Sequence, residues 1–355
     1  MSELTMVKGN EALGEAAIRA GCRFFFGYPI TPQSELPAYM SRRMPEVKGT
    51  YLQAESELAA VNMVLGAAST GVRAMTSSSS PGFSLKQEGI SYMAGSELPC
   101  VVVNVQRGGP GLGNIQPSQS DYFQMTKGGG HGDYRLITLA PSTVQELVDL
   151  TVLAFDLADK YRNPCAILAD GLLGQTMEPV RYPELKGPPD VNRFDWNLTG
   201  AAGRNKRILN SLYLVPEPLE EHNKHLQAKF AEMSKNEVRF ETVHCDDAEL
   251  VVVAYGTAAR IAKQSVLDLR KKGAKVGLYR PISLWPYPTA GIQELVARGV
   301  KKFLTVEMSC GQMVEDVQLA VHGQADVRFF GRTGGIVPTP REITVEIEKV
   351  LGGAK

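Results

Sequence analysis

The segment that most constrains the fold is the apolar run Pro99-Cys100-Val101-Val102-Val103-Asn104-Val105-Gln106. A strand with one solvated face alternates apolar and polar residues, whereas a run of this kind is typical of a parallel strand buried on both faces. Another strand begins at residues 73–76, and further apolar runs at 165–169 and 250–253 also alternate with helical patterns. Because parallel strands need crossover connections, this order predicts an α/β fold with a doubly wound parallel sheet.

The length of the chain and the change of composition along it predict two domains joined by a linker. A length of 355 residues allows two domains of roughly 150 residues each. Residues 178–246 are richer in proline and charge and weaker in periodicity, with one clear helical pattern from residue 218 to 238. We therefore predict a first domain at 1–185, a crossover linker with a helix at 186–246, and a second α/β domain at 247–355.

Composition excludes several classes of function. The 38 acidic and 38 basic residues balance, which gives no indication of a nucleic-acid or anionic-membrane partner. No apolar run is long enough to cross a bilayer, and residues 1–8 lack the apolar core of a signal peptide. The five cysteines are far apart with no CxxC pair, so neither a zinc site nor an iron–sulfur cluster is expected on this chain. Such thiols are typical of a cytoplasmic protein.

A proline-stiffened loop follows the aromatic run 23–26. The loop reads Gly27-Tyr28-Pro29-Ile30-Thr31-Pro32-Gln33-Ser34 and leads into a helical pattern. Proline restricts the backbone on either side of Thr31, which places that hydroxyl on a stiff loop at the carboxyl end of a strand. Ligands bind at this edge of open α/β sheets, although an ordinary strand-to-helix turn with Thr31 as a cap would have the same pattern.

Two carboxylates begin the helical pattern at residues 54–68, which is nearly apolar after its first turn. Acidic residues at a helix N-terminus are stabilised by the helix dipole, and this explains Glu55 or Glu57 without requiring both. The apolar remainder predicts burial in the sheet or in an interface. The serine run at 77–80, before Pro81-Gly82, offers hydroxyl and amide groups to an anion or simply caps the next helix.

Arg107 stands at the end of the apolar run and opens a glycine-rich loop, residues 108–116. An arginine at this edge can bind a carboxylate bidentately, but it can also be an ordinary surface residue. The loop is no dinucleotide fingerprint, because proline interrupts it and no helix opens on it, which weakens the alternative of a nucleotide-binding dehydrogenase. His222 and His225 lie on a solvated helical face, and we expect no metal on this chain.

These motifs carry a resemblance that covers essentially the whole chain. Tyr28-Pro29-Ile30-Thr31-Pro32, then Ser56-Glu57 before an apolar helix, then Arg107-Gly108-Gly109-Pro110-Gly111 closely resemble the alpha subunit of multi-subunit 2-oxoacid:ferredoxin oxidoreductases. The resemblance implies a thiamine-enzyme pyrimidine-type domain followed by a transketolase C-terminal-like domain, the latter marked by Tyr255-Gly256-Thr257 and Tyr279-Arg280-Pro281. Members oxidatively decarboxylate a 2-oxo acid onto coenzyme A. The branched-chain (3-methyl-2-oxobutanoate, or 2-ketoisovalerate) type is the most similar, and the 2-oxoglutarate type is second.

The resemblance also implies roles for individual residues. Glu57 would be the carboxylate at the aminopyrimidine ring nitrogen of thiamine diphosphate, with Tyr28, Pro29 and Ile30 beside the cofactor. Thr31 would lie beside the reactive carbon and the substrate, and Arg107 would bind the substrate carboxylate. Many members carry a substrate-contacting threonine where this chain has Gln116, so the side-chain pocket differs here.

The remaining cofactors are expected on partner chains. Asp170-Gly171 follows Ala169 and so lacks the leading glycine of a thiamine diphosphate and magnesium site. In the family a beta subunit carries the diphosphate and Mg²⁺ site, a ferredoxin-like delta subunit carries [4Fe-4S] clusters, and a gamma subunit completes the complex, with ferredoxin as electron acceptor. The alternative is a non-catalytic assembly subunit in which Glu57 merely caps a helix.

Overall fold

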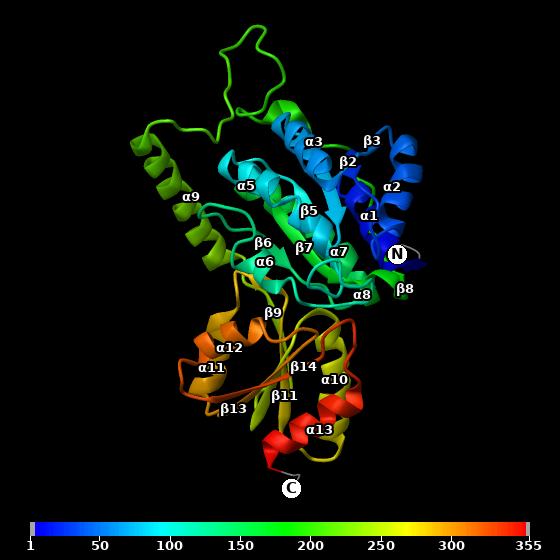
Figure 1. Cartoon of the computed structure of the whole chain (residues 1–355), viewed down its shortest axis with the longest axis vertical. Coiled ribbons are helices and arrows are strands. Elements are labelled where there is room, and N and C mark those ends of the chain that lie inside the picture. The colour runs from blue at the N-terminus through cyan, green and yellow to red at the C-terminus, as the bar shows by residue number, and fades with distance from the viewer. Residues whose placement is uncertain (1–3, 353–355) are drawn as a thin grey trace.

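The computed structural model describes residues 4–352 and shows two α/β units stacked along the long axis of the molecule (Figure 1). The first three residues of the segment predicted to lack a signal peptide lie outside the described part. The first unit contains a seven-stranded sheet in the order β12-β6-β7-β5-β4-β2-β3. Its strands are β2 (Phe24–Gly27), β3 (Thr50–Gln53), β4 (Ala74–Ser78), β5 (Val101–Gln106), β6 (Ile137–Leu139), β7 (Cys165–Asp170) and β12 (Ser283–Trp285).

The strand order reverses between β2 and β4. From β2 the chain moves outward to β3, and it then returns to β4 and proceeds through β5 and β7 on the other side. All these pairings are parallel, and only β12 runs antiparallel, against β6. The predicted doubly wound parallel sheet is therefore confirmed. A crevice outside the carboxyl ends of the strands at such a reversal is where ligands bind in open α/β sheets.

Two groups of helices accompany this sheet. Helix α1 (Gly9–Arg19) packs against α2 (Glu35–Glu46), α7 (Val144–Tyr161) and α8 (Gly171–Gln175), whereas α3 (Glu57–Ser69) packs against α5 (Gln87–Gly95). The remaining elements of residues 4–239 are α4 (Ser80–Ser84), α6 (Tyr122–Thr126), the 3₁₀ turn η1 (Val191–Arg193), α9 (Pro216–Asn236), and the antiparallel pair β1 (Thr5–Lys8) and β8 (Met177–Val180).

The second unit contains a five-stranded sheet in the order β14-β13-β10-β11-β9. The pairings are parallel except that of β9 with β11. Its strands are β9 (Phe240–Val243), β10 (Leu250–Val253), β11 (Val276–Pro281), β13 (Lys302–Glu307) and β14 (Asp326–Gly331). Its helices are α10 (Gly256–Lys271), α11 (Thr289–Ala297), α12 (Met313–Val321) and α13 (Pro340–Leu351).

The two units share a continuous interior. One cluster of buried apolar side chains extends from the first sheet into the second unit and includes Tyr122 and Tyr255, whose rings lie 5.8 Å apart. The fully buried Gln119 donates to the Tyr255 carbonyl at 2.9 Å, and its own side-chain oxygen accepts from Met308 N at 3.0 Å. Strand β12 comes from the second half of the sequence yet extends the first sheet. The division of the chain at residues 185 and 246 stays a prediction.

Most predicted elements occur with small shifts of their ends, but one prediction was wrong. The helical pattern at residues 83–94 folds as two helices, α4 and α5, separated by Leu85 and Lys86. The break places Lys86 in the protein interior rather than on a helix surface. The short strands β1, β8, β9 and β12 were not predicted.

Candidate active site

The candidate site lies where the sheet reverses its strand order. Four loops meet there, because β2, β3, β4 and β5 are parallel and their carboxyl ends share one edge. These loops carry Thr31, Glu57, the serine run and Arg107. Strands β2 and β4 flank the reversal, and β3 and β5 are their outer neighbours, so all four loops lie at or next to it.

A buried glutamine of the loop after β2 fixes the position of this loop. Gln33, which is fully buried, donates to the Tyr28 carbonyl at 3.3 Å and accepts from the Ser77 hydroxyl on β4 at 2.5 Å. These bonds join the loop across the strand reversal. Tyr28, Pro29 and Thr31 are exposed and Ile30 is half-buried, so the predicted cofactor and substrate residues of this loop face outward from a rigid base.

Glu57 is the first residue of α3. The Ser56 hydroxyl caps the helix by accepting from Ala59 N at 3.1 Å. Glu57 is only 5% exposed, whereas Glu55 is exposed, so the structure separates the two acids that the sequence left equivalent. A Cβ at Gly82 would lie 2.2 Å from Oε1 of Glu57 and 2.4 Å from the Ser78 hydroxyl, so only glycine lets α4 approach this carboxylate.

A buried lysine lies beneath the same helix end. Lys86 is fully buried, and its ammonium donates to Thr76 Oγ1 at 2.9 Å and to the backbone carbonyl of Glu57 at 3.3 Å. Burial lowers the pKa of Lys86 to about 7, and the charge of Glu57 opposes this effect only in part. No sequence pattern indicated this residue, because the sequence predicted an unbroken helix at its position.

Arg107 is held by two backbone carbonyls and one side-chain hydroxyl. Its Nη1 donates to the Thr31 carbonyl at 3.0 Å and its Nη2 donates to the Leu112 carbonyl at 2.9 Å. Its backbone N–H donates to the Ser80 hydroxyl at 3.0 Å. Arg107 is 6% exposed, and a guanidinium has five N–H donors, so most of its capacity remains for a ligand. The structure therefore brings Arg107 together with Thr31 directly, and with Glu57 through the short helix α4.

The glycine-rich loop, residues 108–116, returns to its own start. Gly108 N donates to the Gln116 carbonyl at 2.9 Å, and Arg107 pairs with Pro117 as an isolated bridge. Gln116 is exposed at the far end of this loop. A Cβ at Gly335, in the second unit, would lie 2.3 Å from the Gln116 Cβ.

Buried polar atoms without a hydrogen-bond partner at this edge fit a polar ligand. The hydroxyls of Ser78 and Ser79 and Nε of Arg107 are buried without a hydrogen-bond partner within residues 4–352. Buried polar groups are almost always satisfied, so these atoms indicate a ligand or partner chain. A buried carboxylate beside such hydroxyls suits the aminopyrimidine ring of thiamine diphosphate, which offers ring nitrogens and an amino group. Glu57 and its surroundings thus fit the cofactor that the resemblance implied.

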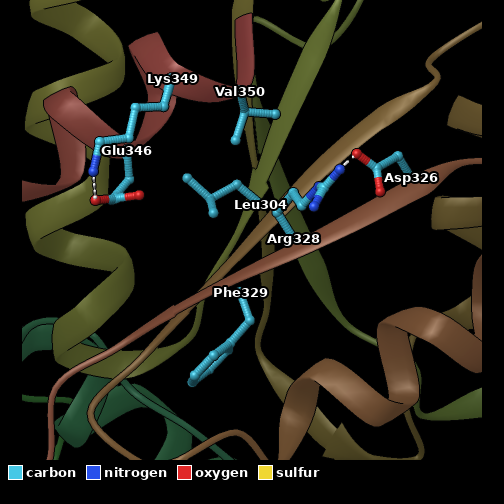
Figure 2. A pocket seen from close by; sticks show the side chains of 7 residues that line it. All are labelled: Leu304, Asp326, Arg328, Phe329, Glu346, Lys349 and Val350. Atoms are coloured by element: carbon cyan, nitrogen blue, oxygen red, sulfur yellow. Dashed lines mark hydrogen bonds and ion pairs between the residues drawn. The ribbon is translucent and has the colours of Figure 1, made fainter. Parts of the chain in front are cut away.

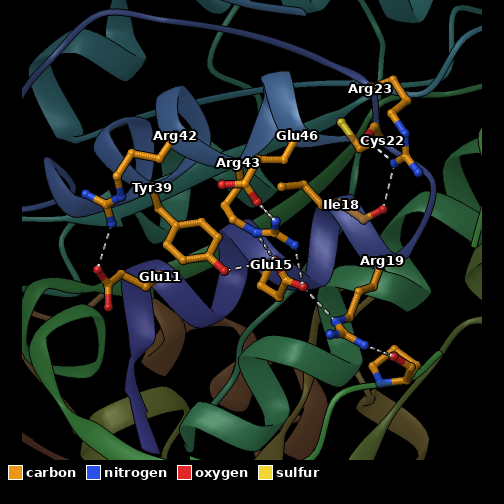
Figure 3. A network of polar contacts seen from close by, with 11 residues as sticks. Glu11, Glu15, Ile18, Arg19, Cys22, Arg23, Tyr39, Arg42, Arg43 and Glu46 are labelled. Carbon is orange, nitrogen blue, oxygen red and sulfur yellow. Dashed lines mark hydrogen bonds and ion pairs between the residues drawn. The ribbon is translucent and has the colours of Figure 1, made fainter. Parts of the chain in front are cut away.

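An ion-pair network fixes the helices behind the loop after β2 (Figure 3). Glu15 on α1 accepts from Arg19 at 2.8 Å, from Tyr39 at 2.8 Å and from Arg43 at 3.2 Å. Burial alone would raise the pKa of Glu15, but the hydrogen bonds from Arg43 and Tyr39 outweigh it and lower the pKa. Because α2 begins directly after the loop, this network sets where Thr31 lies relative to the sheet.

Other polar features lie away from this edge or are already satisfied. Asp170 accepts from Leu172 N and Leu173 N and so caps α8, and burial raises its pKa. A cavity of about 340 Å³ between β14 and α13 is lined by charges that pair with each other, Arg328 with Asp326 and Lys349 with Glu346 (Figure 2). The described residues contain no cluster of three potential metal ligands. Between residues 4 and 352, no helix is both long and apolar enough to cross a membrane.

Comparison with known proteins decides the family. The model of the thiamine diphosphate-binding domain of pyruvate flavodoxin/ferredoxin oxidoreductases matches residues 15–239, and the model of pyruvate:ferredoxin oxidoreductase core domain II matches residues 248–343. The chain belongs to the 2-oxoacid:ferredoxin oxidoreductase family. Ketoisovalerate oxidoreductase subunit VorB of Methanothermobacter marburgensis is 52% identical over 98% of both chains. The 2-oxoglutarate synthase subunit KorA of Methanocaldococcus jannaschii is 37% identical over 96% of this chain and 98% of that one.

Solved structures agree with this assignment. The 2-oxoglutarate:ferredoxin oxidoreductase from Magnetococcus marinus, with 2-oxoglutarate, coenzyme A and succinyl-CoA bound, matches with a TM-score of 0.85 and 26% identity. The match covers 99% of this chain and 66% of that chain. A split-gene transketolase matches 99% of this chain and 100% of that one with a TM-score of 0.60 and 14% identity, which is a likeness of fold. The predicted family, fold class and greater similarity to the branched-chain type are confirmed.

Proposed function

We propose that this chain is the alpha subunit of a 3-methyl-2-oxobutanoate (2-ketoisovalerate):ferredoxin oxidoreductase, a thiamine diphosphate enzyme that forms an acyl-CoA from a branched-chain 2-oxo acid. The observation that carries the proposal is the proximity of three residues at the strand reversal. Arg107 contacts Thr31 directly, and α4 lies between Arg107 and Glu57 and contacts both. The 52% identity to VorB against 37% to KorA favours the branched-chain acid over 2-oxoglutarate. The 2-oxoglutarate type remains the second candidate because the fold of that enzyme covers this whole chain.

Each proposed role follows from what the residue offers. The Glu57 carboxylate accepts a hydrogen bond from, or shares a proton with, the aminopyrimidine ring nitrogen, and its small exposed fraction strengthens that contact. When bound, thiamine diphosphate supplies the carbon nucleophile that attacks the 2-oxo group and the electron sink that decarboxylation needs.

Arg107 binds the substrate carboxylate with the N–H groups that its backbone contacts leave free, and every 2-oxo acid carries such a carboxylate. Thr31 lies beside the reacting carbon, with Tyr28, Pro29 and Ile30 against the cofactor. Gln116 borders the substrate side-chain pocket. These assignments make the subunit catalytic rather than a passive assembly component.

The surface around this edge supports a partner that completes the site. Large apolar side chains on the end of β3 and on the surrounding loops and helix starts are exposed: Tyr28, Leu52, Leu58, Leu85, Leu112 and Ile115. Exposed apolar residues gathered around a functional site are typical of a protein interface. We assign this interface to the beta subunit, which would bring the diphosphate and Mg²⁺ site. Gamma and ferredoxin-like delta subunits would complete the complex, with the [4Fe-4S] clusters on partner chains. Location in the cytoplasm stays a prediction.

Anaerobic purification of the complex tests this proposal. Companion subunits that hold iron–sulfur clusters are expected, together with viologen reduction that depends on coenzyme A. The rate is expected to be highest with 3-methyl-2-oxobutanoate in a panel that includes 2-oxoglutarate and pyruvate. Highest activity with 2-oxoglutarate would replace the substrate assignment. A lone, colourless chain that is inactive with every acid would refute the proposed function.

A further inference from the structure

A turn of the second unit lies against the glycine-rich loop that follows Arg107. The turn comprises residues 333–336 and is closed by a bond from Ile336 N to the Thr333 carbonyl at 3.3 Å. Asn114 Nδ2 donates to the Gly334 carbonyl at 2.8 Å. At Gly335, a Cβ would lie 2.3 Å from the Gln116 Cβ, so the turn and the loop are in contact along two neighbouring residues.

The second unit fixes the position of this turn. Just before it, Arg332 N donates to the Glu307 carbonyl at 3.1 Å and Arg332 Nη1 pairs with Glu342 at 2.9 Å. Just after it, Thr339 and Glu342 form a reciprocal capping box that begins α13. The turn is therefore tied to β13 and α13, and it presents its glycines to the loop from a firm support.

The loop transmits this contact to the guanidinium of Arg107. The Asn114 backbone N–H donates to the Gly108 carbonyl and its side-chain oxygen accepts from Gln116 N, both at 2.9 Å. These bonds fold the loop into a compact ring. The Leu112 carbonyl, on the same ring, accepts from Arg107 Nη2 at 2.9 Å. A displacement of the ring by the turn would therefore rotate or release the guanidinium.

We propose that the turn at residues 333–336 is a positioning element for Arg107, acting through the glycine-rich loop, and that Gly335 and Asn114 are its positioning residues. The inference rests on the proposed role of Arg107 as the group that binds the substrate carboxylate. It gives the second unit a part in substrate binding although its fold contributes none of the candidate catalytic residues. Gly335 has a φ of +88° and no room for a Cβ, so only glycine meets both demands at the contact.

The test compares two glycines with the same backbone strain in the assembled complex. Gly335→Ala adds a methyl group against the loop. Gly273→Ala has the same φ of +88° but no atom within 4 Å of the added Cβ, so it controls for strain alone. A group that holds the substrate equally in the ground and transition states affects KM more than kcat. We expect Gly335→Ala to raise KM for the 2-oxo acid about tenfold with kcat changed less than about twofold, and Gly273→Ala to change neither.

Amide hydrogen exchange of residues 108–116, measured without substrate, gives a second readout. Exchange is expected to accelerate in Gly335→Ala and to stay unchanged in Gly273→Ala, because local opening follows the loss of loop contacts. Asn114→Asp is a milder variant that keeps the side-chain acceptor for Gln116 N but loses the donor to Gly334. It should also raise KM and accelerate exchange. An unchanged KM in both Gly335→Ala and Asn114→Asp would overturn the inference.

A double-mutant cycle tests the route of the effect. Gln116→Gly removes the Cβ that the new methyl group would meet. If the effect passes through this contact, the double variant has the same KM as Gln116→Gly alone, whereas independent effects would multiply and overturn the inference. Arg107→Lys separates the two proposals. If it leaves KM unchanged while exchange still accelerates in Gly335→Ala, the substrate-binding role of Arg107 fails and the positional coupling of turn and loop does not.

Discussion

Replacing Lys86 with methionine should stabilise the chain at neutral pH, which is unusual for a substitution at a fully buried position. Methionine has a similar length and no charge, so it can occupy the same space between α3 and β4. The ammonium of Lys86 makes two hydrogen bonds, to Thr76 and to the Glu57 carbonyl. The question is whether these bonds outweigh the free energy of keeping a proton on a buried amine.

The magnitude follows from the pKa of Lys86, which burial lowers from its ordinary value of 10.5 to about 7. The unfolded chain binds the proton more tightly than the folded chain, so the penalty on folding is absent above pH 10.5 and grows as the pH falls toward 7. It amounts to about 4 kcal/mol at pH 7 and about 1 kcal/mol at pH 10. Loss of the two hydrogen bonds costs about 1 kcal/mol in total. The variant should therefore gain about 3 kcal/mol at pH 7 and almost nothing at pH 10.

Thermal unfolding followed by fluorescence at pH 7 and pH 10 measures this difference. For a chain of this size the gain at pH 7 corresponds to a rise in Tm of about 5 °C. Lys301→Met, at an exposed lysine in the second unit, is the matched control and should leave Tm unchanged at both pH values. A lower Tm for Lys86→Met at pH 7, or an equal rise at both pH values, would refute the reasoning. The first result would mean that the bonds to Thr76 and Glu57 outweigh the burial of charge.

Two further predictions concern ionisation and thiol reactivity. Glu15→Gln should lower the free energy of unfolding by about 2 kcal/mol at pH 7, a value reduced because Arg19 and Arg43 are partly exposed. Since the pKa of Glu15 is lowered in the folded chain, this stabilisation is fully present above the ordinary value of 4.5 and is lost as the pH falls through the folded pKa. The deficit of Glu15→Gln relative to the unsubstituted chain should therefore shrink as the pH falls below 4.5, and a deficit that does not change with pH would contradict the assignment. Iodoacetamide at pH 8 should alkylate Cys310 quickly and the other four thiols only after unfolding. Cys310 is exposed, whereas the other four are buried, and burial raises the pKa of Cys22 and Cys165 to about 12. Rapid modification of more than one thiol in the folded chain, counted by mass spectrometry, would show that the interior opens readily.

The sequence predicted best those features that depend on the apolar pattern within a single strand or helix. The apolar run at β5 predicted a parallel strand buried on both faces, and all six of its residues are buried. The position of the candidate site at one edge of the sheet could also be predicted, because parallel strands place their carboxyl ends together. Thr31, Glu57 and Arg107 could thus be expected at one edge, because each follows the carboxyl end of a predicted strand.

Contacts between distant segments could not be predicted in this way. Lys86 falls inside a pattern that reads as one helix, and its burial depends on how α3 covers β4. Strand β12 joins a sheet whose other strands end before residue 171. The bond from Asn114 to Gly334 spans 220 residues. Periodicity reports which face of an element is apolar, but it does not report which element covers that face.

The choice between Glu55 and Glu57 shows the same limit. Both lie at the start of one helix, and the helix dipole accounts for either. The structure separates them, because the capping geometry of Ser56 turns Glu57 inward against Gly82 while Glu55 remains exposed. The resemblance had selected Glu57, and burial now provides a physical reason for that choice.

The most direct test of the catalytic role of this chain compares Glu57→Gln with Glu55→Gln in the assembled complex. Both substitutions replace one carboxylate by an amide of the same shape, two residues apart. The account predicts that Glu57→Gln lowers the rate of coenzyme A-dependent oxidation of 3-methyl-2-oxobutanoate about a hundredfold or more, with subunits and clusters retained, and that Glu55→Gln keeps the full rate. Full turnover by an assembled, cluster-containing Glu57→Gln complex would contradict it and leave this chain a structural subunit.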